Sequence, residues 1–146
     1  MKIAAVDFGD ARTGLAICDK QEMLASPAGV IQERNFDRAV VKVADALKEL
    51  TPELVVVGNP INMNGTVGER ALRCQDFAHK LEEAMGNIPV VMWDERSTTV
   101  SAIGYLNITD TRGKKRKAVI DTVAATIILE SYLSYRKNQR ESEEIQ

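Results

Sequence analysis

The sequence has 146 residues, which suffices for one domain with a complete hydrophobic core. Hydrophobic residues make up 45% and charged residues 27%, a composition that excludes a disordered chain, and no apolar run is long enough to cross a membrane. The net charge of −2 excludes a general electrostatic attraction to nucleic acid, so any basic surface must be local.

The first third of the chain predicts three strands and a helix. Apolar runs over 3–8 and 14–18 are joined by a turn that contains glycine, which favours a hairpin. A third strand over 24–31 contains Pro27, and proline within a strand suits the edge of a sheet. Apolar residues then recur at helical spacing over 36–50 and stop before a proline, which predicts a helix there.

The rest of the chain alternates strands with helices. Thr66 and Glu69 have the spacing of a capping box, which predicts the start of the first of these helices. In chain order, the predicted elements are a strand over 53–58, a helix over 66–86, a strand over 88–95, a short helix over 98–106, a polar and basic loop over 107–117, and a last helix over 117–135. We expect one domain over 1–138 and a charged, disordered tail over 139–146.

This order of elements predicts an α/β fold. The first strands can pair antiparallel through tight turns, whereas strands separated by helices must run parallel through right-handed crossovers. The later strands are apolar throughout, which is typical of strands covered on both faces. We therefore expect a mixed five-stranded sheet, order 3-2-1-4-5, flanked by helices on both faces.

Three polar segments follow predicted strands that end at one edge of the sheet. The first strand ends at Asp7, the fourth at "NPINMNGT" and the fifth at "DERSTT". That edge is where α/β proteins place their functional sites. Neighbouring residues of a strand point to opposite faces, so only one of Asp94 and Glu95 can join Asp7.

A third acid comes from the last helix. Asp121 shares a stripe of the helix with Ala124, Ala125 and Ile128, and this stripe faces the sheet. A carboxylate in such a place requires a positive partner. Either Asp121 pairs with Lys117 or Arg96 and Asp7 caps the turn to Gly9, or the acids hold a metal.

In the metal hypothesis, Asp7, Glu95 and Asp121 share one or two divalent cations, because a cation relieves the repulsion of clustered carboxylates. An all-oxygen site with few carboxylates suits Mg²⁺ or Mn²⁺, with the remaining positions filled by water and a substrate phosphate. Asp10 and Asp94 are the candidates for a fourth acid.

Several residues near this edge could bind a phosphate substrate. Arg12 and Arg96 could make bidentate phosphate contacts, although structural ion pairs with the same acids are the alternative. Asn59 and Asn62 lie in the predicted loop after the fourth strand, where they could contact substrate or simply form a turn. The run over 112–117, which includes Lys114, Lys115 and Arg116, suits phosphate contact as well as a solvated loop.

Four segments of the chain resemble, in the right order, the signature blocks of the YqgF family, also called RuvX: "VDFGDARTGLA", "VVGNPINMNGTVGERA", "WDERSTT" and "KAVIDTVAATIILESYL". The family is similar to Holliday junction resolvases. The resemblance implies an RNase H-like fold, metal-dependent hydrolysis of phosphodiester bonds and maturation of the 5′ end of pre-16S ribosomal RNA. Matched by motif, Asp7, Glu95 and Asp121 are its catalytic acids.

Other functions remain open at this point. Branched DNA could replace precursor ribosomal RNA as the substrate, and the same fold could serve as a non-catalytic nucleic-acid-binding module. A nucleotide-binding domain of the actin and sugar-kinase class also has D-x-G after its first strand, but it requires a second such loop and a duplicated domain.

The sequence also indicates where the protein is found. Cys18 and Cys74 are isolated, and we expect both to be reduced. The apolar start is interrupted by Asp7 too early for a secretory signal. We therefore expect a cytoplasmic protein with no membrane partner, present as a monomer or a weak homodimer.

Overall fold

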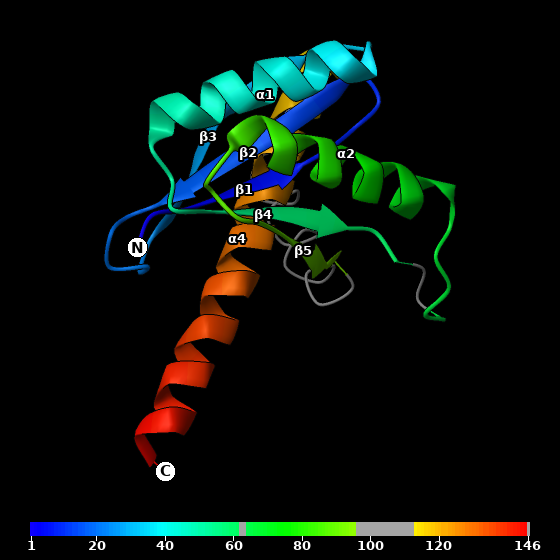
Figure 1. Cartoon of the computed structure of the whole chain (residues 1–146). Coiled ribbons are helices and arrows are strands. Elements are labelled where there is room, and N and C mark those ends of the chain that lie inside the picture. Colours follow the sequence, from blue (N-terminus) through cyan, green and yellow to red (C-terminus); the bar gives the residue numbers. More distant parts are fainter. Residues whose placement is uncertain (62–63, 96–112, 146) are drawn as a thin grey trace.

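The computed structural model describes residues 1–61, 64–95 and 113–145, with the backbone alone for 113–121 and 144–145 (Figure 1). Its strands are β1 (Ile3–Asp7), β2 (Arg12–Cys18), β3 (Ala25–Gln32), β4 (Leu54–Asn59) and β5 (Val90–Asp94). They form one five-stranded sheet in the order β3-β2-β1-β4-β5. This confirms the predicted order, and β3, the strand that contains Pro27, lies at an edge.

The directions of the strands follow from their connections. β1 pairs antiparallel with β2, and β2 with β3, because short turns join them. β4 pairs parallel with β1 and with β5, because a helix lies in each connection. The carboxyl ends of β1, β4 and β5 therefore lie at one edge of the sheet, as predicted.

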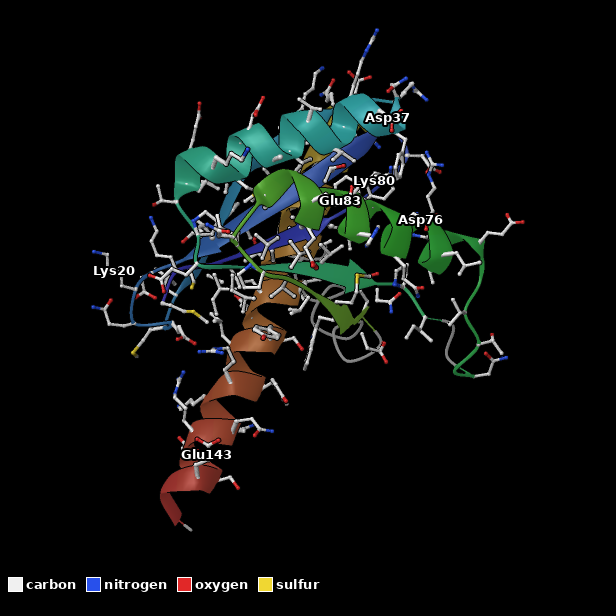
Figure 2. The ribbon with its side chains drawn as sticks, in the orientation of Figure 1. Lys20, Asp37, Asp76, Lys80, Glu83 and Glu143 are labelled. Carbon is white, nitrogen blue, oxygen red and sulfur yellow. The ribbon has the colours of Figure 1, made fainter. Side chains whose placement is uncertain are left out.

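Helices cover both faces of the sheet, as expected (Figure 1). α1 (Phe36–Leu50) and α2 (Glu69–Met85) pack on one face, where Val43, Leu47 and Phe77 are fully buried. α4 (Gly113–Ile145) packs on the other face through Ala125, Ile128 and Leu129. Figure 2 shows polar side chains of α1 and α2, among them Asp37, Asp76 and Lys80, on the outer surface of their layer.

The start of α2 differs from the prediction. The N-cap residue is Gly68, and no side chain caps this helix end. The hydroxyl of Thr66 instead donates to Asn64 Oδ1 at 2.7 Å, and the backbone N–H of Thr66 donates to the same atom at 3.1 Å. Asparagine commonly forms such local turns, and here Thr66 belongs to the turn and lies two residues before the N-cap position that the capping box requires. The predicted capping box is therefore wrong.

The last helix is longer than predicted at both ends. α4 begins at Gly113, so residues 113–117 are helical and do not form the expected basic loop. It continues to Ile145, through the segment expected to be a disordered tail. Both extensions are rich in charged residues of high helix propensity. Composition alone does not show whether such a segment forms a helix or a charged loop. The predicted helix over 98–106 and the loop residues 107–112 lie outside the described residues.

The remaining sequence expectations concern cysteines and membranes. Cys18 and Cys74 are both free and buried, as expected. Of the helices in the described part of the chain, none is long and apolar enough to cross a membrane.

Glu22 ties the C-terminal half of α4 to the turn between β2 and β3. Arg136 Nε donates to Glu22 Oε1 at 2.6 Å, and Arg140 Nη1 donates to the same oxygen at 3.1 Å. The Glu22 side chain is 8% exposed, so these bonds lie largely out of water. The hydrogen bond from Arg136 is the main cause that lowers the pKa of Glu22 from 4.5 to about 2.

We expect Glu22→Gln to destabilise the protein by about 1–3 kcal/mol at neutral pH, because it removes charge-assisted hydrogen bonds. The folded pKa lies below the unfolded one, so this stabilisation is complete above about pH 5 and is lost as the pH falls towards 2. Urea denaturation of both proteins across this pH range measures the difference. Glu53→Gln, at an exposed position, is the control. A wild-type advantage that persists at pH 2 would contradict the assignment.

Candidate active site

Asp7 occupies the last position of β1 and faces α4. Ile3 and Ala5 belong to the core under α4, whereas Ala4 and Val6 belong to the core under α1 and α2. Side chains alternate between faces along a strand, so Asp7 follows Ile3 and Ala5. It lies partly buried at the carboxyl end of the strand.

Alternation along β5 separates the two acids at its end. Trp93 packs in the core under α4, whereas Met92 packs in the core under α1 and α2. Glu95 therefore lies on the face of the sheet that α4 covers. Asp94 lies on the opposite face, in register with Asn59 of β4. The side chain of Glu95 hydrogen-bonds that of Asp7. Topology thus brings together two carboxyl groups that are far apart in sequence.

Gly58 of β4 makes room for the Glu95 carboxyl group. A Cβ atom at position 58 would lie 2.9 Å from Glu95 Oε1 and 2.6 Å from Ile128 Cδ1. Any larger residue must therefore displace the carboxyl group, the isoleucine or both. The glycine lets the backbone of β4, the acid of β5 and helix α4 approach one another closely.

We expect Gly58→Ala to lower activity by about tenfold or more, because small displacements of a reacting group are costly. The double variant Gly58→Ala with Ile128→Val removes the contact with the isoleucine Cδ1 but keeps the contact with Glu95. Stability should recover in the double variant while activity stays low. Thermal unfolding and a cleavage assay on both variants test this. Recovery of activity together with stability would show that the carboxyl group does not depend on Gly58.

The environment of Glu95 opposes its negative charge. Burial raises the pKa of Glu95, and the neighbouring charge of Asp94 raises it further. The charge of Arg70 and the hydrogen bond with Asp7 act in the opposite direction. A partly buried pair of carboxyl groups, in which the pKa of Glu95 is raised, is an arrangement that an added cation stabilises.

Arg70 was not predicted from the sequence. It lies in the first turn of α2, which follows β4 and begins at the same edge of the sheet. The order of strands and helices does indicate this position, because the helix after a parallel strand starts near the site. The predicted helix start at Thr66 lies before the observed start at Glu69, so the prediction placed Arg70 further along the helix.

A cavity of about 240 Å³ lies beside the acids on the α2 side; it is lined by Phe8, Gly9, Asp10, Glu69, Arg70, Arg73 and Cys74. Asp10 Oδ1 accepts from Arg73 Nε at 2.8 Å, so this candidate for a fourth acid is engaged in an ion pair. Burial is the main cause that raises the pKa of the Cys74 thiol to about 12, so it is not a reactive nucleophile.

Of the other predicted site residues, the structure describes some in full, some by their backbone alone and some not at all. Arg12 begins β2 and Asn59 ends β4, both at the edge of the acids. Within the described residues, Asn59 Oδ1 is buried without a hydrogen-bond partner. Lys114, Lys115 and Arg116 lie at the start of α4, and Asp121 lies further along it, with all four side chains outside the description. Asn62 and Arg96 lie outside the described residues.

The donor atoms fit a divalent cation in type. Asp7 and Glu95 supply carboxylate oxygens, which are the ligands that Mg²⁺ and Mn²⁺ prefer. Among the described side chains, no group of three or more metal-ligating residues lies together. The described part of the chain therefore brings together two of the three predicted ligands, and the third would come from Asp121.

Solved structures with the same arrangement define the class of fold. RuvC of T. thermophilus, determined in complex with a Holliday junction substrate, matches with a TM-score of 0.60 and 17% identity over 94% of this chain and 96% of that one. The fowlpox virus Holliday junction resolvase matches with a TM-score of 0.55 and 16% identity over 92% of this chain and 99% of that one. The fold is that of the RNase H-like resolvases.

Sequence comparison identifies the family. The family model of RuvX, described as Holliday junction resolvase, matches residues 1–135. A relative from Caldanaerobacter subterraneus is 41% identical over 94% of this chain and 99% of its own length. One from Bacillus subtilis is 40% identical over 91% of this chain and 97% of its own. Both are named as proposed nucleases of pre-16S rRNA. The chain belongs to the RuvX family, which confirms the resemblance of its four segments.

Proposed function

We propose that this protein is a divalent-metal-dependent nuclease that matures the 5′ end of pre-16S ribosomal RNA in the cytoplasm. The observation that carries the proposal is the hydrogen-bonded pair of Asp7 and Glu95 at the carboxyl ends of β1 and β5. The names of the relatives support the choice of substrate. Asp7, Glu95 and Asp121 are the catalytic acids in this proposal.

The same three acids would hold Mg²⁺ or Mn²⁺, and the bound cation would supply activation of water for attack on phosphorus and stabilisation of the leaving oxygen. Position 121 supports this assignment because it precedes the fully buried Ala125 by one helical turn on the same side of α4. Burial of Glu95 limits the water that reaches the pair and strengthens the interaction of its charge with a cation.

Arginines beside the acids would hold the substrate phosphate. Arg12 begins β2 next to the Gly9 turn, and Arg70 lies close enough to Glu95 for its charge to lower the pKa of that acid. A guanidinium group binds phosphate through two parallel hydrogen bonds, which orient the group as well as neutralise it. We propose that these two arginines position the phosphodiester against Asp7 and Glu95.

The basic start of α4 gives a test of how nucleic acid is held. We expect the replacement of Lys114, Lys115 and Arg116 by alanine to weaken binding similarly for all substrate sequences, because phosphate contacts do not read bases. The slope of log affinity against log salt should become shallower by about 0.7–0.9 for each lost contact. Filter binding at several salt concentrations measures both effects.

The matched control replaces three exposed lysines away from this edge, Lys20, Lys48 and Lys80, which changes the net charge equally. Its salt slope should remain close to that of the wild type. Equal slopes for the two triple variants would show that the start of α4 acts only through net charge.

The decisive experiment offers two substrates side by side, a precursor 16S rRNA fragment and a four-way DNA junction, with Mg²⁺ or Mn²⁺ and with Asp7→Asn as the control. We expect cleavage of the RNA precursor by the wild type alone. Cleavage of the junction instead would favour a resolvase, a function suggested by the description of the family model. Binding of either substrate without cleavage would indicate a non-catalytic module.

A further inference from the structure

Three aromatic rings meet on the α4 face of the sheet, around Trp93 near the carboxyl end of β5. Trp93 of β5 contacts Tyr132 of α4 edge-on, with ring centroids 5.3 Å apart, and Tyr135 at a tilt, with centroids 5.1 Å apart. The two tyrosine rings lie 6.0 Å apart. Trp93 is two residues before Glu95 on the same strand face, so the cluster begins about 7 Å from that acid.

A hydrogen bond fixes the ring of Trp93, and packing holds the two tyrosine rings against it. Trp93 Nε1 donates to Ser131 Oγ at 3.0 Å. Tyr132 lies beside Arg136, which donates a hydrogen bond to Glu22. Tyr135 packs on this rigid support and is 44% exposed. The exposed ring is therefore held in place without being covered by the described residues.

Beyond the aromatic rings, the same face of α4 bears uncharged side chains. Positions three and four residues apart lie on one face of a helix, and the face that contains Tyr135 bears only hydroxyl, amide and aromatic groups beyond the sheet. Its members, which we call the neutral face, are Ser131, Tyr132, Tyr135, Asn138, Gln139 and Ser142. Figure 1 shows this part of α4 extending away from the sheet towards the C-terminus.

We propose that the aromatic cluster and the neutral face bind unpaired bases of the nucleic-acid strand that leaves the active site. Aromatic rings stack on bases of any sequence, and amide side chains hydrogen-bond the edges of unstacked bases. The absence of acidic side chains from the neutral face removes repulsion of the phosphates. The inference rests on the proposed nuclease function, because the position of Trp93 two residues before Glu95 is what identifies a nucleic acid as the occupant.

The surface could not be recognised along the sequence. Trp93 and Tyr132 come from different elements, and no strand has alternating aromatic residues. Only the packing of α4 across the sheet brings Tyr132 and Tyr135 to Trp93 of β5.

The test uses Trp93, the one tryptophan of the chain, as a fluorescent reporter. Oligothymidylate is titrated in EDTA, so that binding is measured without cleavage, and a chain of abasic units of equal length is titrated in parallel. We expect oligothymidylate to quench the emission of Trp93 and to bind roughly tenfold more tightly than the abasic chain. Tyr135→Ala should remove this preference, whereas Tyr135→Phe should keep it.

Val41→Ala, which truncates an exposed apolar side chain on α1, is the matched control and should bind like the wild type. Equal affinity for the two oligomers, or an unchanged preference in Tyr135→Ala, would overturn the proposal. A wild type that sediments as a dimer, together with a monomeric Tyr135→Ala, would assign the surface to a second copy of the chain and overturn it as well. Loss of cleavage does not affect this readout, so the two proposals can fail separately.

Discussion

Asp7→Asn should reduce hydrolysis by at least about 100-fold while leaving the protein folded. The substitution keeps the size of the side chain but removes a negative charge from the site where the cation would be held. An amide at position 7 can still hydrogen-bond the partly buried Glu95 without placing a second negative charge beside it, so the melting temperature should equal or exceed that of the wild type. Steady-state cleavage rates and thermal unfolding measure the two effects.

Asp45→Asn is the matched control, because Asp45 is exposed on α1, on the opposite face of the sheet. It should cleave at the wild-type rate. An Asp7→Asn protein that cleaves at a similar rate would remove Asp7 from the catalytic group, whatever its stability.

Asp121→Asn should cause a loss of hydrolysis as large as that of Asp7→Asn. If the acids hold the same cations, they act as a unit, so the double variant should be little worse than either single variant. The alternative is that Asp121 pairs with Lys117 at the surface. Its replacement would then cost about 0–1 kcal/mol, leave hydrolysis intact and resemble Lys117→Ala. Cleavage rates of the three variants separate the two interpretations.

The order and direction of the strands could be predicted from the sequence, because the connections permit few alternatives. Turns too short for a crossover force β1, β2 and β3 to be antiparallel, and helical connections force β4 and β5 to be parallel. The pairing of Asp7 with Glu95, and not with Asp94, follows from the alternation of side chains along β5. The length of a connection and the alternation of side chains along a strand do not depend on how distant parts of the chain pack.

Features that depend on competition between local interactions could not be predicted. Thr66 forms a local turn with Asn64 and the N-cap falls at Gly68, and a pattern of residue types does not show which of these local structures forms. The basic segment after Gly113 has the composition of both a loop and a helix. Arg70 and the aromatic cluster at Trp93 depend on how elements pack, which spacing along the chain does not show.

The measurement that tests the metal site most directly is thermal unfolding with and without millimolar Mn²⁺, in the absence of nucleic acid. A ligand that binds only the folded state raises its melting temperature. We predict that Mn²⁺ stabilises the wild type and Asp94→Asn, whose acid lies on the opposite face, but not Asp7→Asn or Glu95→Gln. A wild type indifferent to Mn²⁺, or an Asp7→Asn protein that Mn²⁺ stabilises as much as the wild type, would contradict the account.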